Sequence, residues 1–405
     1  MSAMRPFKRL LSSEEALKII MGNIRPLERV EQVRVEDAAG SVLASDVVAG
    51  FNVPPFDRSS MDGYAVRAED TYGASAFEAR RLKLKGVQHA GEIFEGEIGQ
   101  EECLQVATGS PVPKGSDAVV MVEYTKQDGE HVEIQRPAYP GANISPEGED
   151  IKIGEAVVKA GELLTPARVG ALAALNVEMV KVYEKPSVAI YSTGSEIRPL
   201  GGDLAPWEIY DVNSYTLASI VAANGCIPIR AEIVPDDWES IEKAVRDASR
   251  HDLGVFSGGS SVGVRDLFSS VIEEMGKVLF HGLQVKPGKP TLFGIVDGTP
   301  IFGMPGYPTS CLSNAYIFLT PGLRRLAGLP ADEPRTVKAK MGSRFVSSSG
   351  REQFLTVRVL DGVAHTVFKK SGAITSMAHA DGYIVLPVNL DVIEEGEEIT
   401  VTLLF

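Results

Sequence analysis

Residues 253–256 read Leu-Gly-Val-Phe, and residues 257–266 continue Ser-Gly-Gly-Ser-Ser-Val-Gly-Val-Arg-Asp. The apolar run predicts a strand, the small residues a loop, and the pattern beginning at Asp266 a helix. Similar patterns predict strands at 188–191, 227–234, 279–285, 291–296 and 300–303, and helices at 213–224, 236–250 and 308–327. Strands that alternate with helices in this way predict a multidomain α/β plus β protein, with a largely parallel, doubly wound sheet at its centre.

The flanking regions have a different pattern. Short strands broken by Gly and Pro between residues 77 and 150 predict a small β-rich domain. Strands without helices from about residue 334 to 405 predict a small C-terminal β-barrel. Helices are predicted at 12–23 and 166–175, and extended structure at 30–50.

Composition narrows the possible partners. The net charge is −14 and the sequence has no dense Lys/Arg run, which argues against nucleic acid as a partner. No apolar stretch is long enough to span a membrane and no signal peptide is visible, so we expect a cytoplasmic protein. Cys103, Cys226 and Cys311 form no CxxC pair, and we expect them to be buried and reduced.

Three loops of the predicted α/β domain follow strands, where such sheets bind ligands. They lie at 192–196, 257–266 and 303–308, and all contain Gly together with hydroxyl groups or free amides. This composition suits phosphate, although neither a Walker A motif nor GxGxxG is present. One such loop alone is equally consistent with a tight turn before a capped helix, but three at one sheet edge favour a binding site.

Charged residues lie in or near these loops. Lys286 and Lys289 flank a Pro-Gly turn, which is either a rigid anion site or a solvated surface turn. Glu196 and Asp266 end two of the loops and could serve Mg²⁺ or position a hydroxyl group, or simply begin a helix. For Asp236 the helix-capping interpretation is the stronger one.

For three other candidates, composition does not decide between a functional site and an ordinary turn. Asp62, Thr108 and Asp150 lie in Gly-containing turns, and an ordinary turn explains each of them as well as a site does. The six histidines lack metal-ligand spacing, and no Ser-His-Asp or Cys-His set can be identified, so we expect the histidines to be structural.

Taken together, the motifs resemble those of the molybdopterin molybdenumtransferases, the family of bacterial and archaeal MoeA and of the E domain of gephyrin. The resemblance covers essentially the whole chain. It rests on SSMDGYA (59–65), ATGSPVP (107–113), DAVVMVE (117–123), GEDI (148–151), STGSEI (192–197), IYDVNSY (209–215), GGSSVGVRD (258–266), VKPGKP (285–290) and MPGYPTS (304–310).

The resemblance implies four domains. These are an elongated discontinuous region (1–50 and 151–180), a β-rich domain (51–150), a molybdopterin-binding α/β domain (181–329) and a C-terminal β-barrel (330–405). It also implies a homodimer in which the 51–150 domain of one chain faces the α/β domain of the other.

The implied reaction joins molybdate or tungstate to the dithiolene of adenylylated molybdopterin and releases AMP. The resemblance implies that Glu196 and Asp266 bind Mg²⁺, and that Asp62 and Asp236 are further catalytic acids. An upstream adenylyltransferase and downstream apo-molybdoenzymes are implied partners. The implied substrate-binding residues are Thr108, Asp150, Ser192, Thr193, Gly194, Ser195, Gly258, Gly259, Ser260, Ser261, Gly263, Lys286, Lys289, Pro305, Gly306, Pro308, Ser310, Arg351 and Ser371.

Three departures from the family pattern concern the oxyanion site. The arginines that many relatives carry before Gly148 are absent, and Tyr307 stands where relatives often have asparagine. Thr356 stands where relatives often have arginine, which leaves Arg351 or Arg358 as a candidate replacement. Two rival functions remain open at this point, namely molybdopterin adenylyl transfer and non-catalytic carriage of molybdopterin.

Overall fold

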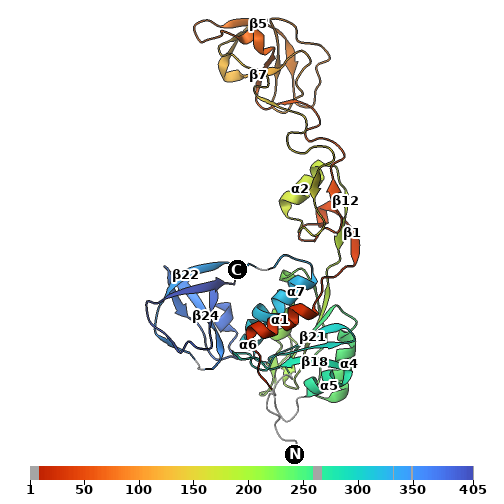
Figure 1. Cartoon of the computed structure of the whole chain (residues 1–405), viewed down its shortest axis with the longest axis vertical. Coiled ribbons are helices and arrows are strands. Elements are labelled where there is room, and N and C mark those ends of the chain that lie inside the picture. The colour runs from red at the N-terminus through yellow and green to blue at the C-terminus, as the bar shows by residue number, and fades with distance from the viewer. Residues whose placement is uncertain (1–8, 259–266, 332, 348–349, 405) are drawn as a thin grey trace, which may run out of the picture. The chain divides into compact units, whose positions relative to one another are not determined.

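A computed structural model of the chain describes residues 9–258, 267–331, 333–347 and 350–404 (Figure 1). The chain forms two compact units. The larger unit comprises Met1–Glu31, Gly40–Val42 and Val182–Phe405, and the smaller comprises Gln32–Ala39 and Leu43–Lys181.

A six-stranded sheet organises the α/β part of the larger unit, in the order β16-β13-β17-β21-β20-β18. The first four strands are parallel, and β20 and β18 are antiparallel to their neighbours, which confirms the predicted largely parallel sheet. The strands are β13 (Ser187–Ser192), β16 (Ile227–Arg230), β17 (Leu253–Ser257), β18 (Gly276–His281), β20 (Leu292–Val296) and β21 (Thr299–Met304).

Helices cover both faces of this sheet (Figure 1). Side chains alternate along β13, so Val188 and Ile190 join one buried cluster whereas Ala189 and Tyr191 join the other. The first cluster includes residues of α1 (Ser13–Asn23), α3 (Asn213–Ala223) and α7 (Thr320–Leu326), and the second includes residues of α4 (Trp238–Ala248) and α5 (Leu267–Met275).

The helix predicted over 308–327 forms with an irregular centre. It consists of α6 (Pro308–Asn314), a π-helical segment η4 (Ala315–Leu319) and α7. Pro321 has no N–H to donate and its ring clashes with the preceding turn, which explains why the regular helix is interrupted just before it.

The C-terminal part of the larger unit is a closed β-barrel, as predicted. Its sheet has the order β19-β24-β25-β22-β28-β26, and the additional pairing of β24 with β26 closes it. The elements are β19 (Val285–Lys286), β22 (Thr336–Met341), β24 (Glu352–Leu360), β25 (Val363–Thr366), α8 (Thr375–Ala378), β26 (Gly382–Leu386) and β28 (Glu398–Leu403), with β23 (Phe345–Val346) paired to β27 (Val392–Ile393).

The smaller unit is mostly β-structure. Its six-stranded sheet has the order β7-β4-β6-β5-β9-β8, and short pairs join β2 to β11 and β3 to β10. A further pair joins β1 to β12, two strands whose residues are divided between the bounds of the two units. The elements are β1 (Val30–Arg34), η1 (Val35–Asp37), β2 (Val47–Val48), β3 (Arg58–Ser59), β4 (Gly63–Val66), η2 (Ala68–Thr71), β5 (Arg80–Gln88), β6 (Glu102–Val106), β7 (Ala118–Met121), η3 (Val122–Tyr124), β8 (Thr125–Asp128), β9 (His131–Ile134), β10 (Ile144–Ser145), β11 (Ala156–Val158), α2 (Pro166–Ala174) and β12 (Met179–Tyr183).

Three sequence expectations need adjustment and one is confirmed. The strand predicted over 279–285 is β18, which ends at His281, and Val285 belongs to β19 of the barrel sheet. The strand predicted over 227–234 ends at Arg230, and Val234 returns only as an isolated bridge to Thr193. The helix predicted from Asp236 begins at Trp238.

Cys103, Cys226 and Cys311 are free and buried, as expected, and burial raises the pKa of Cys103 and of Cys226 to about 12. Within the described ranges, no helix has the length and apolarity that crossing a membrane requires.

Candidate functional site

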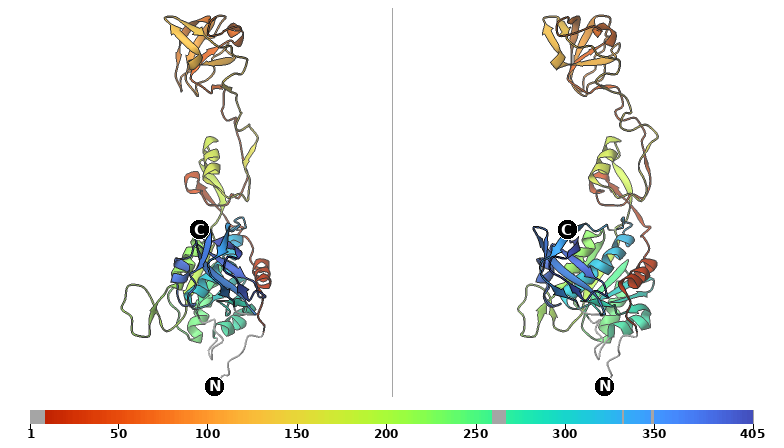
Figure 2. Two further views of the ribbon diagram at one scale, coloured as in Figure 1. Left: turned by 90° about the vertical axis from the view of Figure 1, so that its left-hand side faces the viewer. Right: turned by 60° about the vertical axis from the view of Figure 1, so that its left-hand side comes forward.

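A cavity of about 1340 Å³ lies at the carboxyl ends of the parallel strands. Parts of all three predicted loops line it, through residues 192–194, 257–258 and 305–308. Three further segments contribute to the lining, namely Leu204 with residues 209–213, the turn 286–290 and the barrel segment 368–372. Single residues complete the described lining: Glu196, Ile197, Asp236 and Ser310. The loop between β14 (Ile197–Arg198) and β15 (Ile209–Tyr210) stands out from the unit in yellow-green (Figure 2).

Backbone contacts hold the three loops together. The amide of Thr193 donates to the carbonyl of Ser257 at 2.9 Å, and the amide of Gly258 donates to the carbonyl of Met304 at 3.2 Å. Gly258 has φ +93°, and a Cβ there would lie 2.3 Å from the carbonyl oxygen of Thr193. Only glycine allows this approach, so the loops meet as the sequence predicted.

Asp236 and Asp237 have different roles from those the helix pattern suggested. The side chain of Asp237 caps α4 by accepting from the amide of Ser240 at 2.9 Å, and this bond lowers the pKa of Asp237. Asp236 lines the cavity. The capping interpretation of Asp236 is therefore wrong, because the neighbouring acid occupies the capping position.

Glu196 also lines the cavity, where its carboxylate lies over Gly194. A Cβ on Gly194 would come within 2.9 Å of Oε2 of Glu196, so a larger residue at 194 would displace the carboxylate. Glu196 is exposed, which leaves its carboxylate accessible from the cavity.

Sequence reasoning assigned no role to two buried residues that follow β15. Asp211 accepts from the hydroxyl of Ser192 at 2.8 Å and from the amide of Ser214 at 3.0 Å. Asn213 donates from Nδ2 to the carbonyl of Gly306 at 2.8 Å, while its buried Oδ1 has no partner among the described residues. Asn213 also lines the cavity, and the Ile-Tyr-Asp-Val-Asn motif could have identified it from the sequence.

The turn with Lys286 and Lys289 is anchored from α6. Nδ2 of Asn314, which is 1% exposed, donates to the carbonyl of Gly288 at 2.8 Å and to the hydroxyl of Thr291 at 2.6 Å. β19 also pairs in parallel with β24, which places Lys286 opposite Gln353. Lys286 and Lys289 are half-buried, so the alternative of a freely solvated surface turn does not hold.

The barrel contributes residues 368–372 to the same cavity, including Ser371 as expected. The amide of Thr309 donates to the carbonyl of Ser371 at 3.0 Å, and the hydroxyl of Thr309 donates to the carbonyl of Ala373 at 2.8 Å. Lys369 and Lys370, which sequence reasoning did not select, line the cavity beside Ser371. Their position next to Ser371 in the sequence could have identified these two lysines as candidates.

The structure brings most of the expected residues of the α/β domain to this cavity. Ser195 and Arg351 are described but do not line it. Gly259, Ser260, Ser261, Gly263 and Asp266 lie outside the described residues. The expected residues that line the cavity are Ser192, Thr193, Gly194, Glu196, Asp236, Gly258, Lys286, Lys289, Pro305, Gly306, Pro308, Ser310 and Ser371.

Asp62, Thr108 and Asp150 belong to the smaller unit. Oδ1 of Asp62 accepts from the amide of Thr108 at 2.7 Å and from its hydroxyl at 3.0 Å. These two bonds lower the pKa of Asp62, so its exposed carboxylate is kept ionised. Asp150 is exposed, and its amide donates to the carbonyl of Val53 at 3.0 Å.

The acids of the cavity fit Mg²⁺ only together with a substrate. In the described part of the chain, no three His, Cys, Asp or Glu side chains are grouped closely enough to hold a metal ion by themselves. Mg²⁺ in phosphate-handling sites commonly takes one or two carboxylates and fills its remaining positions with water and phosphate oxygens. Glu196 and Asp236 are carboxylates that line the cavity, and they could supply the one or two protein ligands of such an ion.

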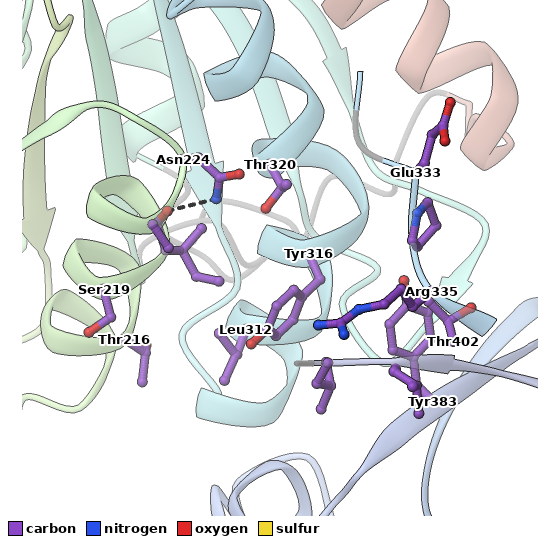
Figure 3. A pocket seen from close by; sticks show the side chains of 15 residues that line it. Thr216, Ser219, Asn224, Leu312, Tyr316, Thr320, Glu333, Arg335, Tyr383 and Thr402 are labelled. Atoms are coloured by element: carbon purple, nitrogen blue, oxygen red, sulfur yellow. Dashed lines mark hydrogen bonds between the residues drawn. The ribbon is translucent and has the colours of Figure 1, made fainter. Parts of the chain in front are cut away.

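A second cavity, of about 510 Å³, lies between α3, the α6–η4 segment and the barrel (Figure 3). Its described lining is mainly hydroxyl-bearing and apolar, with one arginine, Arg335, and one acid, Glu333. The oppositely charged pair gives no excess of positive charge, so this cavity suits a multiply charged anion less well than the larger one.

Three family models match the chain in sequence order. Residues 11–176 match the model described as MoeA N-terminal region (domain I and II). Residues 189–325 match the model described as "Probable molybdopterin binding domain", and residues 338–404 match MoeA C-terminal region (domain IV).

Individual relatives agree with these models. A relative from Methanocaldococcus jannaschii named for molybdopterin biosynthesis is 33% identical, over 99% of this chain and 100% of that protein. A molybdopterin molybdenumtransferase of Staphylococcus aureus is 32% identical, over 88% of this chain and 86% of that protein. The crystal structure of a molybdopterin biosynthesis MoeA protein from Pyrococcus horikoshii matches with TM-score 0.84 and 33% identity, over 98% of this chain and 100% of that one.

Proposed function

We propose that this chain, which belongs to the MoeA family, inserts molybdenum into molybdopterin during synthesis of the molybdenum cofactor. The substrates are adenylylated molybdopterin and molybdate or tungstate. The two dithiolene thiols replace one oxide ligand of the oxyanion, whose oxygen leaves as water, and the metal keeps its oxidation state. Addition of water across the pyrophosphate bond releases AMP and leaves one phosphate on the pterin.

One observation carries the proposal most directly. The cavity joins three small-residue loops at a sheet edge to two pairs of lysines. Small residues let a phosphate group come close to the backbone, and lysines neutralise a dianion. One cavity therefore offers places both for a phosphorylated pterin and for a tetrahedral oxyanion.

The chain's own residues have distinct roles in this proposal. The small residues of the 192–194 and 257–258 loops let the phosphate groups lie close to the backbone, and Asn213 is a polar residue of the same cavity lining. Lys286 and Lys289, with Ser310, hold the oxyanion beside the dithiolene. Holding both reactants in one orientation removes much of the entropic barrier to their reaction.

Glu196 is the carboxylate that we propose for Mg²⁺, assisted by Asp236. Bound Mg²⁺ would stabilise negative charge that develops on the pyrophosphate as AMP leaves. Asp266, the second carboxylate expected for this ion, lies outside the described residues. Removing Mg²⁺ with EDTA should slow AMP release strongly, and restoring Mg²⁺ should recover it.

We further propose a homodimer whose active sites combine residues of both chains. Asp62 is exposed and ionised, so it can act on a substrate that another chain binds. Thr108 and the exposed Asp150 would come from the partner together with Asp62. An adenylyltransferase would supply the substrate, apo-molybdoenzymes would receive the product, and the cytoplasm remains the expected compartment.

The function is tested under anaerobic conditions with purified chain, adenylylated molybdopterin and Mg²⁺. AMP release is followed without oxyanion, with molybdate and with tungstate. We expect release only when an oxyanion is present, and the faster anion identifies the natural substrate. Lys286→Gln should lower the rate by about a hundredfold, because it removes a charge beside the reacting dianion.

Two outcomes would contradict the proposal. AMP release at the same rate without any oxyanion would indicate a hydrolase. Tight binding of the substrate with no AMP release under any condition would indicate a carrier of molybdopterin.

A further inference from the structure

Four lysines line the larger cavity, although the whole chain carries a net charge of −14. Lys286 is the last residue of β19 and Lys289 lies in the turn after it, whereas Lys369 and Lys370 come from the barrel segment before α8. The three acids in the described lining, Glu196, Asp211 and Asp236, come from other segments. Lysines gathered around one cavity repel each other, and an anion bound among them relieves that repulsion.

The short helix α6 holds both lysine-bearing segments. Its residue Thr309, 0% exposed, binds the carbonyls of Ser371 and Ala373, next to Lys369 and Lys370. Its last residue, Asn314, binds the carbonyl of Gly288, between Lys286 and Lys289. The two pairs are therefore fixed to one rigid element rather than carried by independent loops.

The barrel segment has further bonds of its own. The amide of Lys369 donates to the hydroxyl of the buried Ser376 at 2.9 Å, and the amide of Ala373 donates to the carbonyl of Lys370 at 2.8 Å. Nζ of Lys369 also donates to the hydroxyl of Thr375 at 3.3 Å. A backbone held in this way loses little freedom when a ligand binds, which favours affinity.

No arginine of the barrel reaches the cavity among the described residues. Thr356 is 0% exposed on β24, its hydroxyl lacks a described partner, and it does not line the cavity. Neither Arg351 nor Arg358 lines it. Lys369 and Lys370 are the cations that the barrel presents there.

We infer that Lys369 and Lys370 form the barrel half of the oxyanion subsite and select a doubly charged tetrahedral oxyanion over a singly charged one. This inference rests on the proposed function, because it names residues that recognise one of the proposed substrates. Two cations facing a dianion gain about twice the Coulomb energy that they gain with a monoanion of the same size.

Oxyanion binding to the full chain tests this directly. Molybdate, tungstate and perrhenate are measured by equilibrium dialysis, since perrhenate has nearly the size of tungstate but a single charge. We expect the wild type to prefer the dianions. The double variant Lys369→Gln/Lys370→Gln should bind the dianions about tenfold more weakly and perrhenate about threefold more weakly, because half the Coulomb energy corresponds to the square root of the affinity change. The difference should shrink as salt is raised, because both lysines are exposed.

The double variant Lys338→Gln/Lys340→Gln is the matched control. Lys338 and Lys340 are exposed lysines of the same barrel that do not line the cavity, so their loss removes two positive charges elsewhere. The inference would be overturned if the control variant weakened oxyanion binding as much as the double variant does. It would also be overturned if the double variant kept the wild-type preference for dianions, or if the wild type bound no oxyanion. Thermal unfolding of each variant identifies any loss of fold.

The two proposals can fail separately. Oxyanion-dependent AMP release that is identical in wild type and double variant would overturn the role of Lys369 and Lys370 and leave molybdenum insertion standing. Weakened dianion binding in the double variant, with no AMP release by the wild type, would support the subsite and overturn the insertion activity.

Discussion

At the scale of single residues, two hydrogen bonds from Thr108 favour the ionised form of the Asp62 carboxyl group. Both bonds from Thr108 stabilise the carboxylate and place the pKa of Asp62 below its ordinary value. Because the pKa of Asp62 is lowered in the folded state, its bonds with Thr108 stabilise the fold at pH values above the ordinary carboxyl pKa. That stabilisation is lost as the pH falls through the folded-state pKa.

We predict that Thr108→Val raises the pKa of Asp62 part of the way to its ordinary value. The substitution removes the hydroxyl donor but keeps the backbone N–H, so one of the two bonds remains. Titration of the Asp62 carboxyl by carbon NMR measures the change. Thr299→Val is the control, because the hydroxyl of Thr299 donates to the carbonyl of Ser249 in the larger unit and should leave Asp62 unaffected. An unchanged pKa in Thr108→Val would contradict this account.

Residue types identified most of the candidate site but not every role. The Gly, Ser and Lys residues of the loops could be selected from the sequence because phosphate and oxyanions need small residues, amides and cations. Asp236 and Asp237 could not be told apart, because either acid can cap the helix and only the backbone geometry decides which one does. Lys369 and Lys370 were missed because their relevance depends on contacts with α6 that are distant in the chain.

At the scale of elements, α6 connects the α/β sheet to the barrel. Thr309 near its start and Asn314 at its end bind the two lysine-bearing segments. Gly288 fits beneath Asn314, with φ +100° and with space for no side chain, since a Cβ would lie 2.3 Å from Nδ2 of Asn314. The position of the lysine turn therefore depends on one close contact.

Gly288→Ala should displace this turn. We predict that it weakens oxyanion binding about tenfold and destabilises the fold by about 1–3 kcal/mol, because it breaks the buried hydrogen bond of Asn314 and forces an unfavourable φ. Equilibrium dialysis and denaturant unfolding measure the two effects.

Gly298→Ala is the control that introduces backbone strain without a close contact like that between Gly288 and Asn314. Gly298 has φ +84°, yet a Cβ there would meet nothing within 4 Å. This control should lose some stability but keep oxyanion binding. Equal loss of binding in both variants would show that the close contact with Asn314 does not position the lysines.

The order of the elements was predictable, whereas their ends were less so. Alternating strands and helices predicted the parallel sheet, since apolar runs and helical periodicity mark such elements strongly. The early end of β16 at Arg230 and the π-helical segment before Pro321 were not predicted. Both depend on the local fit of the backbone, which residue periodicity does not record.

At the scale of the whole molecule, the central question is whether the active site is shared between chains. Asp62 belongs to one compact unit and Lys286 to the other. We predict that Asp62→Asn and Lys286→Gln are each nearly inactive alone. Mixed and refolded together, they should recover about a quarter of the wild-type rate, because half of the dimers would be mixed and each would hold one intact site.

The same mixing experiment has a clear negative result. If each site were built from a single chain, the mixture would stay as inactive as its components. Mixing two samples of Asp62→Asn is the control and should give no recovery.

Molybdenum insertion itself is tested most directly by a single anaerobic turnover in which AMP and pterin-bound molybdenum are both counted. The enzyme is loaded with adenylylated molybdopterin and Mg²⁺, molybdate is added, and both products are measured at each time. We predict that one molybdenum becomes bound to the pterin for each AMP released, with the same time course. AMP that appears without molybdenum on the pterin would contradict the central claim that this protein inserts the metal.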